Sequence, residues 1–426
     1  MKVVNLISLL TAAFLIQHVT LKAQSDPIKE SLNVTGELTP ISFGEQFTYY
    51  SKILDETRTV NIYLPEHYYE SSEEHTYPVV LLNDRHGDQF FHTTAGIVRH
   101  LSSVDRIPES IVVSFHNAEG YAPNVYNNGM WGSQEMLEFD ADPDLFIKHL
   151  TEEFFPYLES NFRAVDYRII VGVSGSAIFP MHTFAKAPGL FQGHFILASA
   201  DVVGMGYASG ETFIDAFELA LQDNSNLRGN LYFGVADGDL TWQEEYITNV
   251  DELKQRLDPY LTDNFKMKID VIPNEDHYAS YMKAMLAGFE IVFPKKKWSA
   301  RYRDLVKQNG NALANIDAFY NNLSDEYGFR ILPKADRWNN VNCYRFIGSR
   351  FLLEERTDEA IEVIQRWVKY RPKSAEALSQ LAKGYKTNDQ MELAISTQKA
   401  AITLARQYDL ESVSKYEKQL IELNKK

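Results

Sequence analysis

The amino-acid sequence predicts an α/β fold, a mostly parallel sheet with helices on both faces, followed by an all-α region. Between residues 45 and 295, continuous apolar runs of strand length alternate with helix-patterned segments. This alternation is typical of parallel strands that are buried on both faces. From Pro294-Lys295-Lys296-Lys297 onward, a basic stretch leads into sequence with a helical apolar period and few strand signals.

The first two strands are predicted to form an antiparallel hairpin. Residues 46–54 and 57–64 alternate apolar and polar side chains, and Asp55-Glu56 separates the two segments. Helix patterns, for example from Leu145 to Leu158, lie between the later strands. Those later strands are six apolar runs, at residues 77–82, 111–115, 169–172, 194–198, 231–235 and 267–272.

The run at residues 169–172 leads into Gly172-Val173-Ser174-Gly175-Ser176, and a helix pattern starts at Ile178. This order predicts a buried strand, a tight turn with Ser174 at its apex, and a helix. Such a turn lifts the serine hydroxyl out of the sheet and aims the N-terminus of the helix at a bound substrate. Ser176 stands where glycine is usual in this motif. The alternative interpretation is an ordinary strand-to-helix turn with a capping serine.

Reactive side chains in open α/β sheets gather at the carboxyl ends of the strands. Asp237 and Asp239 follow the run at 231–235, and His277 follows the run at 267–272. The chain order Ser, Asp, His is that of α/β-hydrolases. Serine needs an imidazole to take its proton, and the imidazole needs a carboxylate on its other nitrogen. We therefore predict Ser174 as nucleophile, His277 as base and Asp237 as acid, with Asp239 as the alternative acid.

Backbone N–H groups are expected to stabilise the oxyanion that forms in such a site. Gly175 supplies one of them, and the loop from Arg85 to Asp88, with Gly87, supplies the other. A long polar and aromatic loop starts at Tyr121 and ends before Trp131-Gly132. We expect Tyr121 and Trp131 to contact substrate, the alternative being an ordinary surface loop.

No cofactor and no metal are predicted. The sequence contains no His-Glu-x-x-His or comparable spacing of metal ligands. Cys343 is the single cysteine, which rules out an internal disulfide and a cysteine-based zinc cluster.

Residues from about 45 to 295 resemble the bacterial esterase family of α/β-hydrolases that includes feruloyl esterases, S-formylglutathione hydrolase and siderophore-releasing esterases. The resemblance implies Ser174 as nucleophile, His277 as base and Asp237 as acid. Where the family has Leu-Asp-Gly after the first parallel strand, this sequence has Leu82-Asn83-Asp84-Arg85. The matching segments are residues 58–65, 77–82, 154–158, 161–163 and 172–176, and His277 leading into 288–290.

The N-terminus predicts export. Met1-Lys2 precedes a mostly apolar stretch from Val3 to Val19, and Leu21-Lys22-Ala23 offers a cleavage site. We read residues 1–23 as a removable signal peptide and expect a periplasmic or secreted protein without a membrane span. No cysteine lies near the cleavage site, which argues against a lipid anchor.

Two domains are expected after the signal peptide, an esterase domain at 24–297 and a helical domain at 298–426. A spacing of 34 residues relates pairs of positions in the helical part, as in tetratricopeptide repeats. Two repeats bury a core poorly alone, so this domain is expected to dock on the hydrolase domain or on a protein partner. The paired positions are Ile347 with Leu381, Gly348 with Ala382, Phe351 with Tyr385, and Ala360 with Ala394.

The net charge is −16, and it is unevenly distributed along the chain. Residues 301–426 carry a net charge of +4, so the remainder carries −20. An acidic catalytic half repels nucleic acid and accepts neutral or cationic substrates more easily.

Together these features favour an exported serine ester hydrolase that forms an acyl-enzyme, with an acyl-polysaccharide or a siderophore-type ester as substrate. The alternative is a catalytically weak hydrolase fold that serves as a binding or assembly module through its helical repeats. Ser176 and the irregular loop after Leu82 favour this alternative.

Overall fold

The computed structural model describes residues 41–83, 90–116, 142–208, 210–298, 302–307, 310–337 and 342–425. Phe43 to Lys426 form one compact unit. The predicted signal peptide, Gly87, Tyr121 and Trp131 lie outside the described residues.

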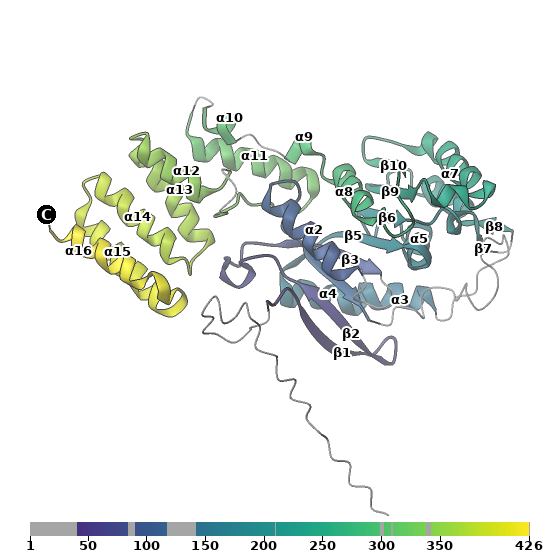
Figure 1. Cartoon of the computed structure of the whole chain (residues 1–426), viewed down its shortest axis with the longest axis horizontal. Helices are drawn as coiled ribbons and strands as arrows, with labels where there is room; N and C mark the ends of the chain where they lie inside the picture. Colours follow the sequence, from purple (N-terminus) through teal and green to yellow (C-terminus); the bar gives the residue numbers. More distant parts are fainter. Residues whose placement is uncertain are drawn as a thin grey trace, which may run out of the picture. The chain divides into compact units, whose positions relative to one another are not determined.

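An eight-stranded sheet forms the centre of the fold, in the order β1-β2-β4-β3-β5-β6-β9-β10 (Figure 1). The pairs β1–β2 and β2–β4 are antiparallel, and all other neighbours are parallel. The predicted hairpin and the predicted parallel sheet are both confirmed. The strands are β1 Glu45–Ser51, β2 Glu56–Tyr63, β3 Tyr77–Asn83, β4 Ile111–Phe115, β5 Ala164–Val173, β6 Gly193–Leu197, β9 Gly229–Ala236 and β10 Phe265–Ile272.

Successive side chains of a strand point to opposite faces, and the central strands β3, β4 and β6 are buried on both. On β3, Val80 and Leu82 pack with α2 (Phe91–Ser103) and α8 (Tyr281–Val292). Val79 and Leu81, one position away, pack with helices on the other face.

Five helices with a π-helical turn cover that second face, in two apolar clusters. They are α3 Pro143–His149, the π-helical turn η3 Leu150–Phe154, α4 Phe155–Phe162, α5 Ile178–Lys186, α6 Phe213–Asp223 and α7 Glu244–Leu257. The predicted covering of both faces is therefore confirmed. A small antiparallel pair, β7 Gly206–Ala208 and β8 Glu211–Thr212, has no counterpart in the sequence prediction.

The C-terminal region is helical, as predicted (Figure 1). Close packing of α12 on α13 requires a small residue at Gly348, because a Cβ there would lie 2.4 Å from Ile364 Cγ1. The assignment of these helices to tetratricopeptide repeats stays a prediction. The helices are α9 Lys295–Trp298, α10 Tyr302–Lys307, α11 Ala312–Tyr327, α12 Tyr344–Leu353, α13 Thr357–Tyr370, α14 Ala375–Thr387, α15 Met391–Tyr408 and α16 Val413–Leu423.

The C-terminal helical region packs against the part of the chain that carries the sheet. Leu323, Phe329 and Ile331 belong to the same apolar cluster as Val80 and Leu82 of β3. The expected domain boundary between residues 297 and 298 therefore lies inside one compact unit. The division of the chain into two domains at this point stays a prediction.

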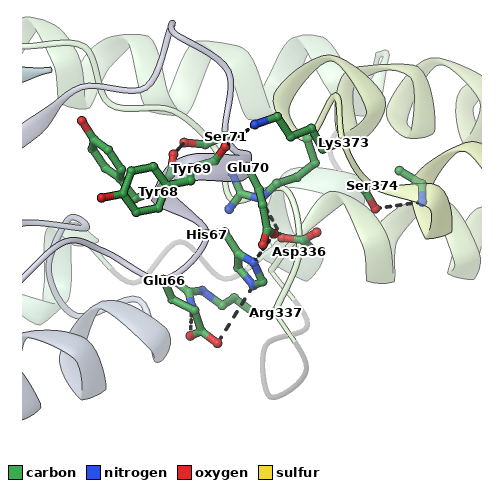
Figure 2. Close-up of polar contacts among 12 residues, drawn as sticks. Glu66, His67, Tyr68, Tyr69, Glu70, Ser71, Asp336, Arg337, Lys373 and Ser374 are labelled. Atoms are coloured by element: carbon green, nitrogen blue, oxygen red, sulfur yellow. Dashed lines mark hydrogen bonds and ion pairs between the residues drawn. The ribbon is translucent and has the colours of Figure 1, made fainter. Parts of the chain in front are cut away.

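Buried charges reinforce this contact. Arg337, whose side chain is 4% exposed, pairs with Glu66 at 2.5 Å (Figure 2). Arg337 also pairs with Glu109. Burial would raise the pKa of Glu109, but the neighbouring cations, Arg337 foremost, lower it to about 2. Close by, Lys373 donates to the carbonyl oxygen of Tyr69 at 2.8 Å (Figure 2).

Among the residues that the structure describes, none of the helices has the length and apolar character needed to cross a membrane.

Candidate active site

Ser174 lies at the turn between β5 and α5. Its φ is 54°, in the left-handed region that L-residues rarely adopt. A short 3-10 helix, η4 (Ser174–Ala177), follows and continues into α5. Gly172 lets the turn fold back on the strand, because a Cβ there would lie 2.5 Å from Ala177 Cα. The strained serine between a parallel strand and a helix is the geometry of a nucleophile elbow.

Ser176, the departure from the usual motif, is hydrogen-bonded within the turn. Its Oγ accepts from the N–H of Val173 at 3.0 Å and donates to the carbonyl oxygen of Val173 at 2.8 Å. Asn83 donates from Nδ2 to the carbonyl oxygen of Ser176 at 2.6 Å, which ties the turn to the end of β3. The serine therefore stabilises the turn where the motif usually has glycine.

His277 and Asp239 form a hydrogen-bonded pair. Nδ1 of His277 lies 2.9 Å from Oδ2 of Asp239, whose side chain is only 5% exposed. A carboxylate only accepts hydrogen bonds, so Nδ1 carries the proton and Nε2 keeps its lone pair. Asp239 begins the 3-10 helix η6 (Asp239–Thr241) directly after β9, and His277 lies in the loop after β10.

Asp237, the acid favoured by the sequence analysis, has other partners. Its carboxylate accepts from the N–H groups of Asn274 at 2.8 Å and Glu275 at 3.1 Å. These hydrogen bonds lower the pKa of Asp237. Asp237 thus holds the loop that carries His277, while the alternative, Asp239, contacts the imidazole itself. The geometry favours Asp239 over Asp237 as the acid.

Ser174, Asp239 and His277 all lie at the carboxyl edge of the sheet, after β5, β9 and β10. β6 lies between β5 and β9, and Ser199, just after it, donates from Oγ to the carbonyl oxygen of Ser174 at 3.2 Å. Gly175 follows Ser174 in η4, where the expected oxyanion donor would lie. The arrangement places the His277–Asp239 pair at the same edge of the sheet as Ser174.

Two further residues near His277 were missed by the sequence analysis. Asp201 is 6% exposed and lies just beyond the end of β6. Burial raises its pKa to about 6, and it interacts electrostatically with His277 and Asp239. An acid just past a parallel strand was the signal that pointed to Asp237 and Asp239, and it applies to Asp201 as well. Trp242 stacks on the imidazole of His277, and no sequence pattern indicates this contact.

A cavity of about 780 Å³ lies elsewhere in the described part of the chain. Gln192, Asn230 and Lys266 line it, at the opposite edge of the sheet where β6, β9 and β10 begin. The residues of the His277–Asp239 pair take no part in it. Within the same described ranges, no group of three His, Cys, Asp or Glu side chains is placed to hold a metal ion.

A serine on a left-handed turn after a central parallel strand, with a His–Asp pair farther along the same edge, is the arrangement expected of an α/β-hydrolase site. The sequence model of the family described as "Putative esterase" matches residues 51–202, which include Ser174. The resemblance to esterases of the α/β-hydrolase class that the sequence indicates is thereby confirmed. No curated protein matches the sequence.

Solved structures share the fold. An IroE-like serine hydrolase from Shewanella oneidensis is 19% identical, with a TM-score of 0.57 over 76% of this chain and 99% of that chain. An uncharacterised protein from Capnocytophaga ochracea is 13% identical, with a TM-score of 0.50 over 90% of this chain and 100% of that one. Siderophore hydrolase EstA from Aspergillus nidulans is 14% identical, with a TM-score of 0.48 over 61% of this chain and 98% of that chain. The first two matches confirm the predicted fold class.

Proposed function

We propose that the protein is a serine carboxylic-ester hydrolase, with Ser174 as nucleophile, His277 as base and Asp239 as acid. The observation that carries the proposal is the 2.9 Å contact between His277 Nδ1 and buried Asp239. It leaves Nε2 of the imidazole as the proton acceptor, at the sheet edge where Ser174 occupies a nucleophile elbow. The match of residues 51–202 to an esterase family supports the same reaction class.

The reaction follows from these groups. Nε2 of His277 takes the proton of Ser174 Oγ as the oxygen attacks the ester carbonyl, and Asp239 stabilises the imidazolium. The tetrahedral intermediate collapses when the C–O bond to the alcohol breaks, and His277 returns the proton to that alcohol. A water molecule, deprotonated by His277, then attacks the acyl carbonyl. The bond to Ser174 Oγ breaks, Oγ takes the proton back from His277, and the carboxylic acid is released. Gly175 N–H and a donor from the loop around Gly87 are the proposed oxyanion hole.

The substrate is proposed to be a neutral or cationic ester, either an acyl-polysaccharide or a siderophore-type ester. The net charge of −20 outside residues 301–426 supports this class, because it disfavours polyanions. Export by the segment at 1–23, and substrate contacts by Tyr121 and Trp131, remain predictions.

A fluorophosphonate probe tests the proposal directly. The probe reacts with an activated serine, so it should label the wild-type protein and fail to label Ser174→Ala. Hydrolysis of aryl and short acyl esters by the same two proteins then identifies the acyl preference. Wild-type protein that folds but is neither labelled nor active contradicts the proposal.

The second candidate function is a binding or assembly module that works through the helical repeats. The observation that favours it is the burial of Ser174, which is only 3% exposed. A folded protein without labelling would support this function, and a protein partner of α12 to α16 would then be sought.

A further inference from the structure

Aromatic side chains border His277. The indole of Trp242 stacks on its imidazole, with ring centroids 5.7 Å apart and planes 23° apart. The ring of Tyr278 meets the same imidazole edge-on, with centroids 4.6 Å apart. Tyr278 also packs on Phe90, whose ring centroid lies 4.5 Å from that of Tyr281. These contacts form a continuous row of rings, from the turn after β9 to the start of α2 and α8.

The two ends of this row differ in exposure. Tyr281 is 3% exposed, and its hydroxyl lies 2.6 Å from that of buried Thr94, within hydrogen-bonding distance. At the other end, Trp242 is 61% exposed and Tyr278 is 50% exposed. Exposed aromatic rings that gather beside a reactive group are typical of a ligand-binding surface. The buried end therefore holds the row in place, and the exposed end is available for binding.

The proposed reaction determines which part of an ester meets these exposed rings. His277 returns its proton to the departing alcohol, so the alcohol lies beside the imidazole. The acyl carbon is bonded to Ser174, which follows β5. Trp242 and Tyr278 follow β9 and β10, which lie beyond β6 in the sheet. The exposed rings are thus on the alcohol side of the site, away from the acyl group.

The chain neighbours of Trp242 are polar. Thr241, Gln243 and Glu244 are all exposed next to it. An alkyl alcohol on the indole would displace water from these groups without replacing its hydrogen bonds. A sugar ring has a face of C–H groups, which the indole face attracts, and a rim of hydroxyl groups that pair with hydroxyl, amide and carboxylate side chains. A sugar therefore matches both the aromatic face and its polar border.

We propose that Trp242 and Tyr278 bind the alcohol portion of the ester, and that this alcohol is a sugar. The inference rests on the proposed function, because the proton returned by His277 is what locates the alcohol. It narrows the two substrate classes given above to a sugar ester and assigns residues to its recognition. The net charge of −20 outside residues 301–426 favours a neutral sugar over an acidic one.

Two esters that share one acyl group test the proposal. One has methyl glucoside as its alcohol and the other has ethanol, and the acyl group is the one preferred in the panel of aryl and short acyl esters. Wild-type protein should hydrolyse the glucoside ester with the higher kcat/KM. Trp242→Ala should lower that value about three- to tenfold, mainly through KM, because one aromatic contact is lost. It should change kcat/KM for the ethyl ester by less than about twofold.

Tyr50→Ala is the matched control, since Tyr50 is 58% exposed on β1, at the other end of the strand order. It should leave kcat/KM unchanged for both esters. Trp242→Phe should keep part of the preference, because a smaller aromatic face remains. Equal losses for both esters in Trp242→Ala would make Trp242 a support of His277 alone and overturn the inference. A larger loss for the benzyl ester of the same acid than for the glucoside ester would assign an aromatic alcohol and overturn the sugar.

Binding without turnover is measured in the Ser174→Ala protein. Saturation-transfer NMR with the intact glucoside ester should give signal at the C–H protons of the sugar ring, and the added Trp242→Ala should remove that signal. Signal confined to the acyl protons would overturn the inference while leaving the proposed function intact. Failure of the proposed function differs from this result: folded wild-type protein then hydrolyses none of the esters, and the inference fails with it.

Discussion

At the scale of single residues, Asp237 and Asp239 stand two positions apart and have different partners. Asp239 contacts the imidazole of His277, and Asp237 binds the backbone of the loop that carries it. The same substitution at each position therefore tests the proposed catalytic role of Asp239 separately from the support of the loop by Asp237.

Asp239→Asn should lower kcat for an aryl ester by about 10³-fold or more, because the amide cannot hold the required tautomer of His277. Asp237→Asn should lower kcat for the same ester by less than about tenfold, because it weakens backbone hydrogen bonds that contribute about 1 kcal/mol each. Steady-state kinetics of the two variants, with circular dichroism to confirm folding, make the comparison. Equal losses would contradict the assignment of Asp239 as the acid.

Ser176 gives a second prediction at this scale. Ser176→Ala removes both hydrogen bonds to Val173 and should lower the free energy of unfolding by about 1 kcal/mol with ester hydrolysis retained. Thermal unfolding measures the loss. Ser176→Gly restores the usual motif, and a large gain in its kcat would show that Ser176 restrains the site rather than supports it.

At the scale of elements, buried segments were predicted better than exposed ones. The apolar run at 111–115 coincides with β4, which is buried throughout. β5 begins at Ala164, five residues before the predicted run at 169–172, because its first half includes the polar residues Asp166 and Arg168. A continuous run of apolar residues indicates only the part of a strand that is buried on both faces. The ends of a strand that reach solvent carry polar residues and are therefore not predicted by such a run.

For the candidate site, too, one part could be predicted from the sequence and another could not. The order of Ser174 and His277 after parallel strands predicted their shared edge, because strand direction alone determines it. The choice between Asp237 and Asp239 depends on which carboxylate faces the next loop, and residue order cannot decide that. The stacking of Trp242 on His277 likewise depends on the path of a turn.

Helix packing gives a prediction at this scale. Gly348→Ala should lower the free energy of unfolding by about 1–3 kcal/mol, because the new methyl group would overlap Ile364 on α13. Gly96→Ala on α2 is the matched control, since a Cβ there meets nothing within 4 Å. It should stabilise the protein by up to about 1 kcal/mol. Urea unfolding of both variants tests the pair, and equal effects would contradict close packing of α12 on α13.

At the scale of the whole molecule, Arg337 joins the two regions of the chain. Arg337→Ala should lower the free energy of unfolding by about 3–5 kcal/mol, because it leaves the buried carboxylate of Glu109 without its main partner. Adding Glu109→Gln should restore part of the loss by removing the uncompensated charge. Chemical denaturation measures both variants, and a double variant as unstable as the single one would contradict this account.

Acid should weaken the fold through buried histidines. Burial lowers the pKa of His75 to about 4 and that of His194 to about 3, both from an ordinary value of 6.5. Between pH 6.5 and these values the unfolded chain binds protons that the folded chain excludes. Stability is therefore complete above pH 6.5 and falls as the pH drops, by up to about 1.4 kcal/mol per pH unit for each group.

Urea unfolding at pH 7 and pH 5 measures this slope. Glutamine does not titrate, so His75→Gln should reduce the dependence of the free energy of unfolding on pH by the contribution of one histidine. A slope unchanged in His75→Gln would mean that His75 is already protonated in the folded protein.

The pair of Arg337 with Glu109 also orders events during synthesis. Glu109 leaves the ribosome 228 residues ahead of its partner, a delay of about 10 to 45 seconds at ordinary rates of translation. Until the later segment emerges, a carboxylate destined for the interior has no counter-charge and must stay hydrated. The nascent chain thus has a physical reason to postpone its final collapse until translation has passed Arg337.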